Sequence, residues 1–241
     1  MRPGIGSRES GIAAWRTECV VLVLLLNAAT ALGQGAPAAA SPTPSYSRWQ
    51  IGVAGEARLV QHRLNAGNGV ELSSGTLFGG SGRIGIGRYV ELGVSVATGA
   101  LTADSAQADD ADLARGEAHL AFLPVPWLAV RAGAEAHTFT TSVATQRWES
   151  ARLGGEARLR FVGGRLAGLL RFEFYPVMSV SGLAKPNRGF GAASGLMFES
   201  GVVTAGLLYE LERYDFPATA GVERHEQLGT LSIELGLRLR K

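Results

Sequence analysis

Residues 90–97 read VELGVSVA, and residues 231–240 read LSIELGLRLR. In both stretches every second side chain is apolar, and charged, glycine or small residues fill the positions between. Successive side chains of a β-strand point to opposite faces, so this period of two predicts strands with one apolar face and one polar face.

The same alternation continues along most of the chain. It predicts ten strands separated by turn residues, and no segment of useful length shows the 3.6-residue period of a helix. The predicted strands lie near 48–61, 76–87, 90–102, 113–123, 127–142, 149–162, 165–180, 187–199, 202–214 and 227–240.

The connections between these strands alternate in length. Short turns are predicted at 87–89, 124–126, 163–164 and 200–201, and longer polar loops near 62–75, 103–112, 143–148, 181–186 and 215–226. Alternate connections of an up-and-down sheet lie at opposite ends, so the short turns share one end, as in transmembrane barrels. The prediction is an all-β fold, an antiparallel up-and-down transmembrane β-barrel over residues 47–241, with ten strands or, as the alternative, eight.

The direction of the apolar face separates a membrane barrel from a soluble barrel with an apolar core. The middle of this face carries no charge. A lipid-facing arginine costs about 2–4 kcal/mol, although a protein core would exclude charge as well. Aromatic residues near the strand ends predict two interfacial girdles and hence lipid outside. The predicted girdle residues are Trp49, Tyr89, Phe122, Trp127, Phe161 and Phe198 at the short-turn end, and Phe78, Phe139, Trp148, Phe174, Tyr175, Phe190, Tyr214 and Phe216 at the loop end.

The polar face mixes arginine and glutamate with glycine and alanine, as a crowded lumen requires. Its charges form either an ion-pair network that fills the barrel or the selectivity lining of a thin channel. The predicted lumen residues are Glu56, Arg58, Arg83, Glu91, Arg115, Glu117, Arg131, Glu135, Glu156, Arg158, Arg171, Glu173, Glu234 and Arg238, with Glu210 and Glu212 on the same face. The inferred neighbours across the strands are Arg115 with Glu135, Glu117 with Arg131, Glu156 with Arg171, Arg152 with Glu173 and Arg83 with Glu91.

The N-terminus predicts export. Residues 1–33 have the basic, apolar and small-residue regions of a secretory signal peptide, and the apolar run 20–26 is too short to favour a spanning helix. Residues 34–46 form an Ala/Pro/Ser linker that we expect to be disordered. The single cysteine, Cys19, falls inside the signal, so we expect no disulfide or thiol site in the mature chain. These features predict a protein of the outer membrane.

The remaining chemistry-bearing residues form no clear site, and we predict no cofactor, no metal site and no catalytic group. The net charge of +2 without clustered lysine and arginine argues against a nucleic-acid partner. His119 and His137 share the lumen face, as members of the polar network or, alternatively, as a metal or catalytic pair. His62 and His225 are expected at solvated loop bases. The acidic loop 103–112 lacks the spacing of a calcium loop.

In its strand pattern, residues 47–241 resemble the small outer-membrane β-barrel proteins, including the OmpA-type transmembrane domain. The resemblance implies, as partners, the lipid bilayer, lipopolysaccharide and the barrel-assembly machinery, with the ligand of the long loops unknown. Such chains commonly end in an aromatic residue, whereas this one ends Leu239-Arg240-Lys241.

Omptins, ten-stranded outer-membrane proteases, provide the enzyme hypothesis. Their site is an aspartate pair that faces an Asp/His pair across the extracellular rim. Asp109-Asp110 is similar to the first half, but the loop around 182–186 has neither Asp nor His. We therefore expect a non-enzymatic barrel with a largely closed lumen, acting in envelope structure or in surface interaction through its loops. The alternatives are a narrow channel for ions or small solutes and an outer-membrane hydrolase.

Overall fold

The computed structural model describes residues 49–67, 69–106, 108–218 and 221–240. They belong to one compact unit, Tyr46–Lys241. The predicted signal peptide at 1–33, the linker at 34–46 and Cys19 lie outside the described residues. Within them, no helix has the length and hydropathy needed to cross a membrane.

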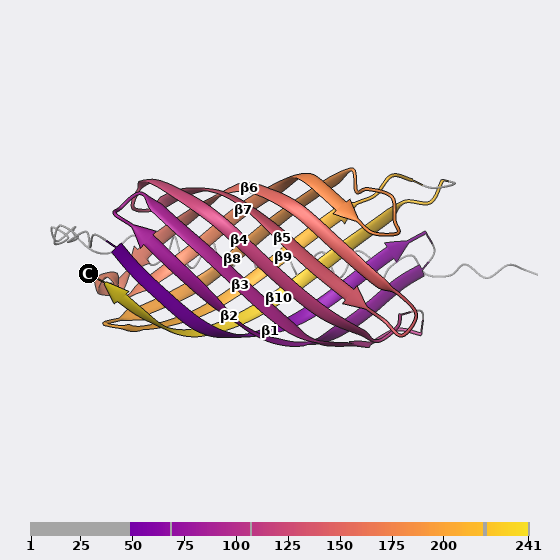
Figure 1. Ribbon diagram of the computed structural model, residues 1–241, viewed down its shortest axis with the longest axis horizontal. Helices are drawn as coiled ribbons and strands as arrows, with labels where there is room; N and C mark the ends of the chain where they lie inside the picture. The colour runs from indigo at the N-terminus through magenta and orange to yellow at the C-terminus, as the bar shows by residue number, and fades with distance from the viewer. Residues whose placement is uncertain (1–48, 68, 107, 219–220, 241) are drawn as a thin grey trace, which may run out of the picture. The chain divides into compact units, whose positions relative to one another are not determined.

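Ten strands make up almost all of this unit (Figure 1), and a short 3₁₀ turn, η1 at Val162–Gly164, connects β6 to β7. The strands are β1 Trp49–Ala66, β2 Gly69–Ile86, β3 Val90–Ala103, β4 Ala111–Val125, β5 Leu128–Thr140, β6 Thr145–Phe161, β7 Leu166–Val180, β8 Arg188–Ser200, β9 Val203–Asp215 and β10 Arg224–Arg240.

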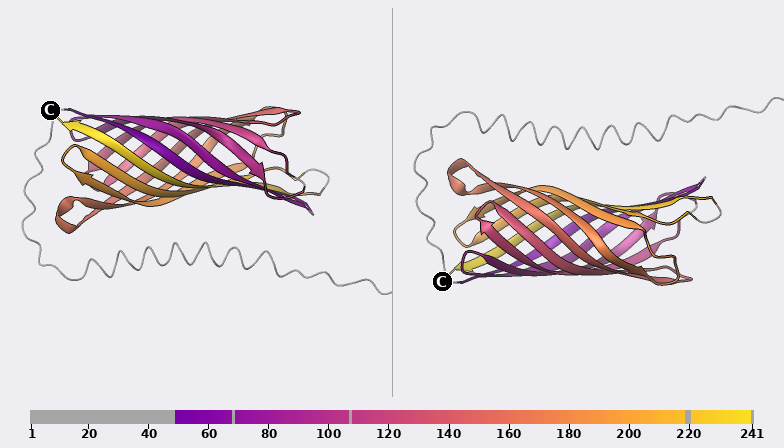
Figure 2. Two further views of the ribbon diagram at one scale, coloured as in Figure 1. Left: turned by 90° about the horizontal axis from the view of Figure 1, so that it is seen from below. Right: turned by 90° about the horizontal axis from the view of Figure 1, so that it is seen from above.

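The sheet closes on itself. Each strand pairs antiparallel with its neighbours in the chain, and β1 pairs with β10 from Gln50↔Arg240 to Ala66↔Arg224. Figures 1 and 2 show the tilted strands winding around one axis, with the start of β1 beside the end of β10. The predicted fold, a ten-stranded antiparallel up-and-down barrel, is therefore confirmed.

The apolar face of the sheet points outward. Val94 and Leu235 are 58% and 65% exposed, whereas Glu91 and Ala97 on the opposite face of β3 are buried. A soluble barrel with an apolar core has the reverse arrangement, because water favours charged side chains outside. The wide apolar exterior is the surface that a lipid bilayer covers.

The first predicted loop, 62–75, is wrong. Strands β1 and β2 continue as a hairpin to Ala66↔Gly69, and Gly67 has φ of 62° in the tight turn. The Gly and Asn residues that suggested a long loop are the residues that a tight hairpin turn selects, because its backbone needs positive φ. The other four long connections lie within a few residues of their predicted positions.

A charge on the outer face tests its contact with lipid. Val94→Arg should lower the yield of folded barrel in lipid vesicles, because a lipid-facing arginine near the midplane costs about 2–4 kcal/mol. Heat-modifiable migration on gels measures that yield. Val94→Ala, at the same outward position, is the control that should fold normally, and normal folding of Val94→Arg would contradict the assignment of faces.

Candidate functional site

The centre of the lumen is held by Arg152 of β6, which is 2% exposed. Its guanidinium contacts the carboxylates of Glu135 and Glu212 and lies 3.3 Å from Glu173 and 3.6 Å from Glu210. A buried arginine needs this many acceptors, because an unpaired charge in low dielectric is strongly destabilising.

A second arginine ties opposite walls of the barrel together. Arg115 of β4 lies 2.7 Å from Glu135 of the adjacent β5 and also contacts Glu212 of β9. Five strand steps separate β4 from β9 in either direction around the ring. Because Arg115 and Glu212 meet across the full width of the barrel, their side chains block its central section.

Further ion pairs continue toward the short-turn end. Arg131 lies 2.9 Å from Glu156, 3.2 Å from Glu117 and 3.3 Å from Glu173. The other pairs are Arg158 with Glu91 and Glu156, Arg171 with Glu210, Arg83 with Glu234, Arg58 with Glu56, and Arg238 with Glu199. Every predicted lumen residue thus takes part in an ion pair.

Two details of the predicted pairing differ from the structure. Arg115 is opposite His137 and Glu117 is opposite Glu135, because the turn lies at residues 126–127, between the paired Val125 and Leu128, rather than around residue 125. The register also shifts by one residue between Phe122 and Val125. Pro124 in this segment has no N–H to continue the ladder. The predicted contacts Arg115–Glu135 and Arg131–Glu117 still form, because arginine is long enough to bridge diagonal positions.

The other three inferred pairs occupy the positions expected for them, although one of them forms no ion pair. Glu156 does lie opposite Arg171, and Arg152 lies 3.3 Å from Glu173, as expected. Arg83 is diagonal to Glu91, as expected, since Arg83 is opposite Gly93 and Glu91 is opposite Gly85, but its ion pair, at 2.7 Å, is with Glu234 of β10. That partner is two strands away around the ring, since β1 lies between β2 and β10.

Between these charged side chains lies a cavity of about 120 Å³. Its polar lining includes Glu56, Arg83, Glu117, His119 and Glu234. A space of this size and polarity holds several waters, because one water needs only about 10–15 Å³.

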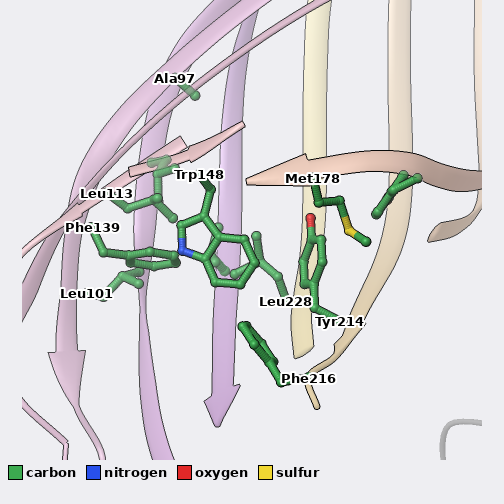
Figure 3. Packing of buried hydrophobic residues seen from close by; sticks show 12 residues of the cluster. Ala97, Leu101, Leu113, Phe139, Trp148, Met178, Tyr214, Phe216 and Leu228 are labelled. Atoms are coloured by element: carbon green, nitrogen blue, oxygen red, sulfur yellow. The ribbon is translucent and has the colours of Figure 1, made fainter. Parts of the chain in front are cut away.

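At the loop end the lumen is filled by an apolar cluster, here called the aromatic plug. Figure 3 shows the rings converging inside the barrel, and Trp148 is central among them. The Trp148 ring lies 4.9 Å from Tyr214 and 5.7 Å from Phe216 between ring centroids. The plug consists of Val60, Leu77, Ala97, Leu101, Leu113, Phe139, Trp148, Tyr175, Met178, Tyr214, Phe216 and Leu228.

The prediction for the loop-end girdle is therefore wrong for most of its residues, although Phe78, Phe174 and Phe190 are exposed on the outer face. Phe139, Trp148, Tyr175 and Tyr214 are buried inside the barrel and do not face lipid. Strand alternation explains their direction, since Phe139 shares the inward face with Glu135, and Tyr214 shares it with Glu212. At the short-turn end, Trp49, Tyr89, Phe122, Trp127 and Phe198 are exposed and Phe161 is half-buried. Their interfacial role stays a prediction.

The four histidines divide between the lumen and the rim. His137 lies 3.0 Å from Glu135 and stacks on Trp148, and His119 lies 3.4 Å from Glu117, so both belong to the polar network. His62 is paired with Glu226 at 2.8 Å and stacks on Phe139, which places it inside the barrel mouth rather than at a solvated loop base.

His225 stands on the rim in a polar group that sequence reasoning missed. Its Nδ1 lies 2.8 Å from Asp215, which Arg213 also contacts at 2.8 Å, and its Nε2 lies 3.4 Å from Glu223. The neighbours of His225 in the chain do not reveal this group, because Asp215 faces it across the β9–β10 hairpin. A correct register for the β9–β10 hairpin predicts that His225 lies opposite Asp215.

The residues of the protease hypothesis lie apart in their contacts. The carboxylate of Asp110 accepts a hydrogen bond from the backbone N–H of Ala103 at 2.8 Å and so closes its own loop. In the described part of the chain, no hydrogen bond or ion pair joins Asp109 or Asp110 to His225. Nor do three or more His, Cys, Asp or Glu side chains of these residues gather as a metal site.

A solved structure shares this fold, and two others match with lower scores. The outer membrane protease OmpT from Escherichia coli matches with a TM-score of 0.57 at 8% identity, over 83% of this chain and 100% of that chain. The translocator domain of the autotransporter NalP from Neisseria meningitidis matches at 0.41 and 12% identity, over 95% and 98%. Ail, the attachment invasion locus protein of Yersinia pestis, matches at 0.34 and 12% identity, over 78% and 98%. The last two scores are too low to carry an argument.

No protein-family model and no curated protein matches the sequence. At 8% identity the likeness to OmpT shows a common fold and nothing about chemistry. The closed ten-stranded sheet, its apolar exterior and its charged interior define the protein as a transmembrane β-barrel of the outer-membrane type.

Removing Arg152 tests the central network. Arg152→Ala should lower the free energy of unfolding by about 3–5 kcal/mol, because it leaves buried carboxylates without their partner. Urea titration of the barrel in detergent measures the change. Arg147→Ala is the control, since its pair with Glu149 has side chains 67% and 54% exposed and should contribute at most about 1 kcal/mol. Equal effects of the two variants would contradict the network.

Tryptophan fluorescence can distinguish a side chain inside the barrel from one that faces lipid. In variants that keep a single tryptophan, brominated lipids should quench Trp127, which is 53% exposed, far more than Trp148, which is 2% exposed. The physical reason is that quenching needs contact with lipid chains, and Trp148 lies inside the barrel. Equal quenching of the two would place Trp148 on the outer wall and overturn the plug.

Proposed function

We propose that the protein is a non-enzymatic integral barrel of the outer membrane with a largely closed lumen. Its role is in envelope structure or in surface interaction through its long loops. The observation that carries this proposal is the contact between Arg115 and Glu212 across the full width of the barrel.

Two independent layers support a closed lumen. The ion pairs around Arg152 fill the middle, and the aromatic plug fills the loop end. A barrel of about eight strands is just filled by its own side chains, whereas porins with aqueous channels have 16–18 strands. Ten strands lie close to the filled limit, so a wide pore is not expected.

The alternative is a narrow channel for ions or small solutes. The cavity between the lumen ion pairs favours it, because about 120 Å³ of polar space already lies inside the barrel there. A conducting path would still have to cross the aromatic plug. A dry apolar constriction of that kind opposes ion passage.

The arrangement of the rim supports the absence of enzymatic activity. A hydrolytic site needs a base within hydrogen-bond reach of a nucleophile or a bound water, held by an orienting group. Among the described residues, His225 contacts the carboxylates of Asp215 and Glu223 and the guanidinium of Arg213, and it forms no hydrogen bond to a hydroxyl or thiol that could act as the nucleophile.

Conductance decides between the closed barrel and the channel. The purified protein, inserted into planar bilayers, should give no steady conductance steps, because both filled layers exclude a continuous water path. Stable open steps would contradict the closed barrel and favour the channel. Insertion is checked in the same sample by heat-modifiable migration.

Turnover assays test the non-enzymatic role. The folded protein should hydrolyse neither fluorogenic peptides nor phospholipids above a detergent blank. Activity that persists through purification and disappears in His225→Ala would contradict the proposal and place catalysis at the rim.

A further inference from the structure

Three arginines and one glutamate lie where the lumen opens at the short-turn end. They are here called the basic mouth and consist of Arg160 of β6, Glu199 of β8, and Arg238 and Arg240 of β10. Each lies within two residues of the end of its strand, and Figure 1 shows β10 ending at this rim. Arg160 has the parity of the buried Arg152 on β6, and Arg238 has that of Glu234 on β10, so alternation directs these side chains into the lumen.

Contacts between strands bring the four charges of the basic mouth together. The guanidinium of Arg238 contacts the carboxylate of Glu199, and that of Arg240 lies 3.6 Å from the same carboxylate. The backbone N–H of Glu199 donates to the carbonyl of Arg165 at 2.7 Å, so the turn that follows Arg160 lies beside it. Arg160 is close enough to act electrostatically on both Glu199 and Arg240.

The basic mouth carries more positive than negative charge. Within the described part of the chain, Glu199 is the one carboxylate that pairs with these arginines, and Arg160 forms no ion pair. Arg238 is nearly buried, with a side chain only 10% exposed, and its Nε has no hydrogen-bond partner among the same residues. A buried donor without a partner is unfavourable, so this site has unused capacity to bind an anion.

The surroundings of the basic mouth do not supply the missing negative charge. Residues 34–50, which lead into β1, contain neither aspartate nor glutamate. Further inside lies the cavity between the lumen ion pairs, whose lining includes Met197, two residues from Glu199 on β8. That lining has six glutamates and five arginines, so it does not attract a second anion. An anion that enters from the short-turn end is therefore held at the basic mouth.

We propose that the basic mouth binds the phosphate group of a small water-soluble compound. A phosphate group carries a charge of about −1.5 to −2 at pH 7 and three acceptor oxygens, which suits the two arginines that Glu199 leaves unneutralised. The planar fork of arginine matches phosphate oxygens, whereas a monocarboxylate would balance only one charge. Because the arginines face the lumen, a ligand in water reaches them more directly than a lipid headgroup does. That the ligand comes from the periplasm rests on the proposed function.

Calorimetric titration of the detergent-extracted full chain with inorganic phosphate tests the proposal. Arg160→Gln/Arg240→Gln removes the excess charge but keeps the buried pair of Arg238 with Glu199, so the barrel should fold normally. Its phosphate affinity should fall about tenfold or more, because two charge-assisted donors are lost. Arg147→Gln is the matched control, since Arg147 is an exposed arginine at the other end of β6. It should bind phosphate like the wild type.

A second variant shifts the charge in the opposite direction. Glu199→Gln removes the carboxylate that competes with the ligand for Arg238 and Arg240. It should tighten phosphate binding several-fold, and added salt should weaken binding in every variant, because screening reduces the attraction between the charges. A merely structural role of Glu199 predicts unchanged or weaker binding. Heat-modifiable migration confirms that each variant is folded, and Arg160→Gln/Arg240→Gln decides the question if Glu199→Gln does not fold.

Several outcomes would overturn the inference. They are no binding of phosphate by the folded wild type, wild-type affinity in Arg160→Gln/Arg240→Gln, and an equal loss in Arg147→Gln. Succinate that binds as tightly as phosphate would show a carboxylate site instead, and tighter binding of phosphatidylglycerol would make a lipid the source of the phosphate group. Each of these results, obtained with a folded barrel, refutes this inference alone. Steady conductance or enzymatic turnover refutes the proposed function and leaves the phosphate titrations unaffected.

Discussion

The structure depends on the pairing of β1 with β10. In hydrocarbon an unpaired backbone N–H or C=O costs several kcal/mol, so a sheet can cross a membrane only when it has no edge. The ladder from Gln50↔Arg240 to Ala66↔Arg224 removes both edges at once. Once the ring is closed, every second side chain must point into a narrow interior, and the others must face lipid.

This confinement explains the chemistry of the lumen. Charged side chains that cannot reach water must neutralise one another, and Arg115 and Arg152 do so with carboxylates from several strands. Replacing buried ion pairs by apolar residues is often neutral, so these pairs are weak contributors to net stability. Their more direct consequence is geometric, because contacts between β4 and β9 hold opposite walls at a set distance.

The aromatic plug fills the narrow lumen without buried charges. Near the loops the lumen is filled with apolar rings rather than charges, and Trp148 packs against Tyr214 and Phe216. The two layers meet at His137, which contacts Glu135 on one side and the Trp148 ring on the other. Side chains fill the lumen from its centre to the loop end. The surfaces left for interaction there are the long loops and the outer wall.

Much of this arrangement could be predicted, because strand alternation is a local property. The period of two, as in 90–97 and 231–240, predicts the strands and divides their residues between two faces, and the alternating lengths of the connections predict the antiparallel up-and-down order that the structure shows. The same period, applied without exception, would also have turned Phe139 and Tyr214 inward. The preference of aromatic rings for the membrane interface predicts the opposite direction at the loop end, and for these two residues that prediction is wrong.

The sequence by itself therefore determined which residues form strands and which face each residue takes, since both follow from neighbours one or two positions away. Only the tertiary structure decided which charges meet. Arg115 and Glu212 are 97 positions apart and become partners only when the ring closes. The irregular ladder beyond Phe122 and the pairing of His225 with Asp215 likewise depend on register, which hydrogen bonding between strands sets.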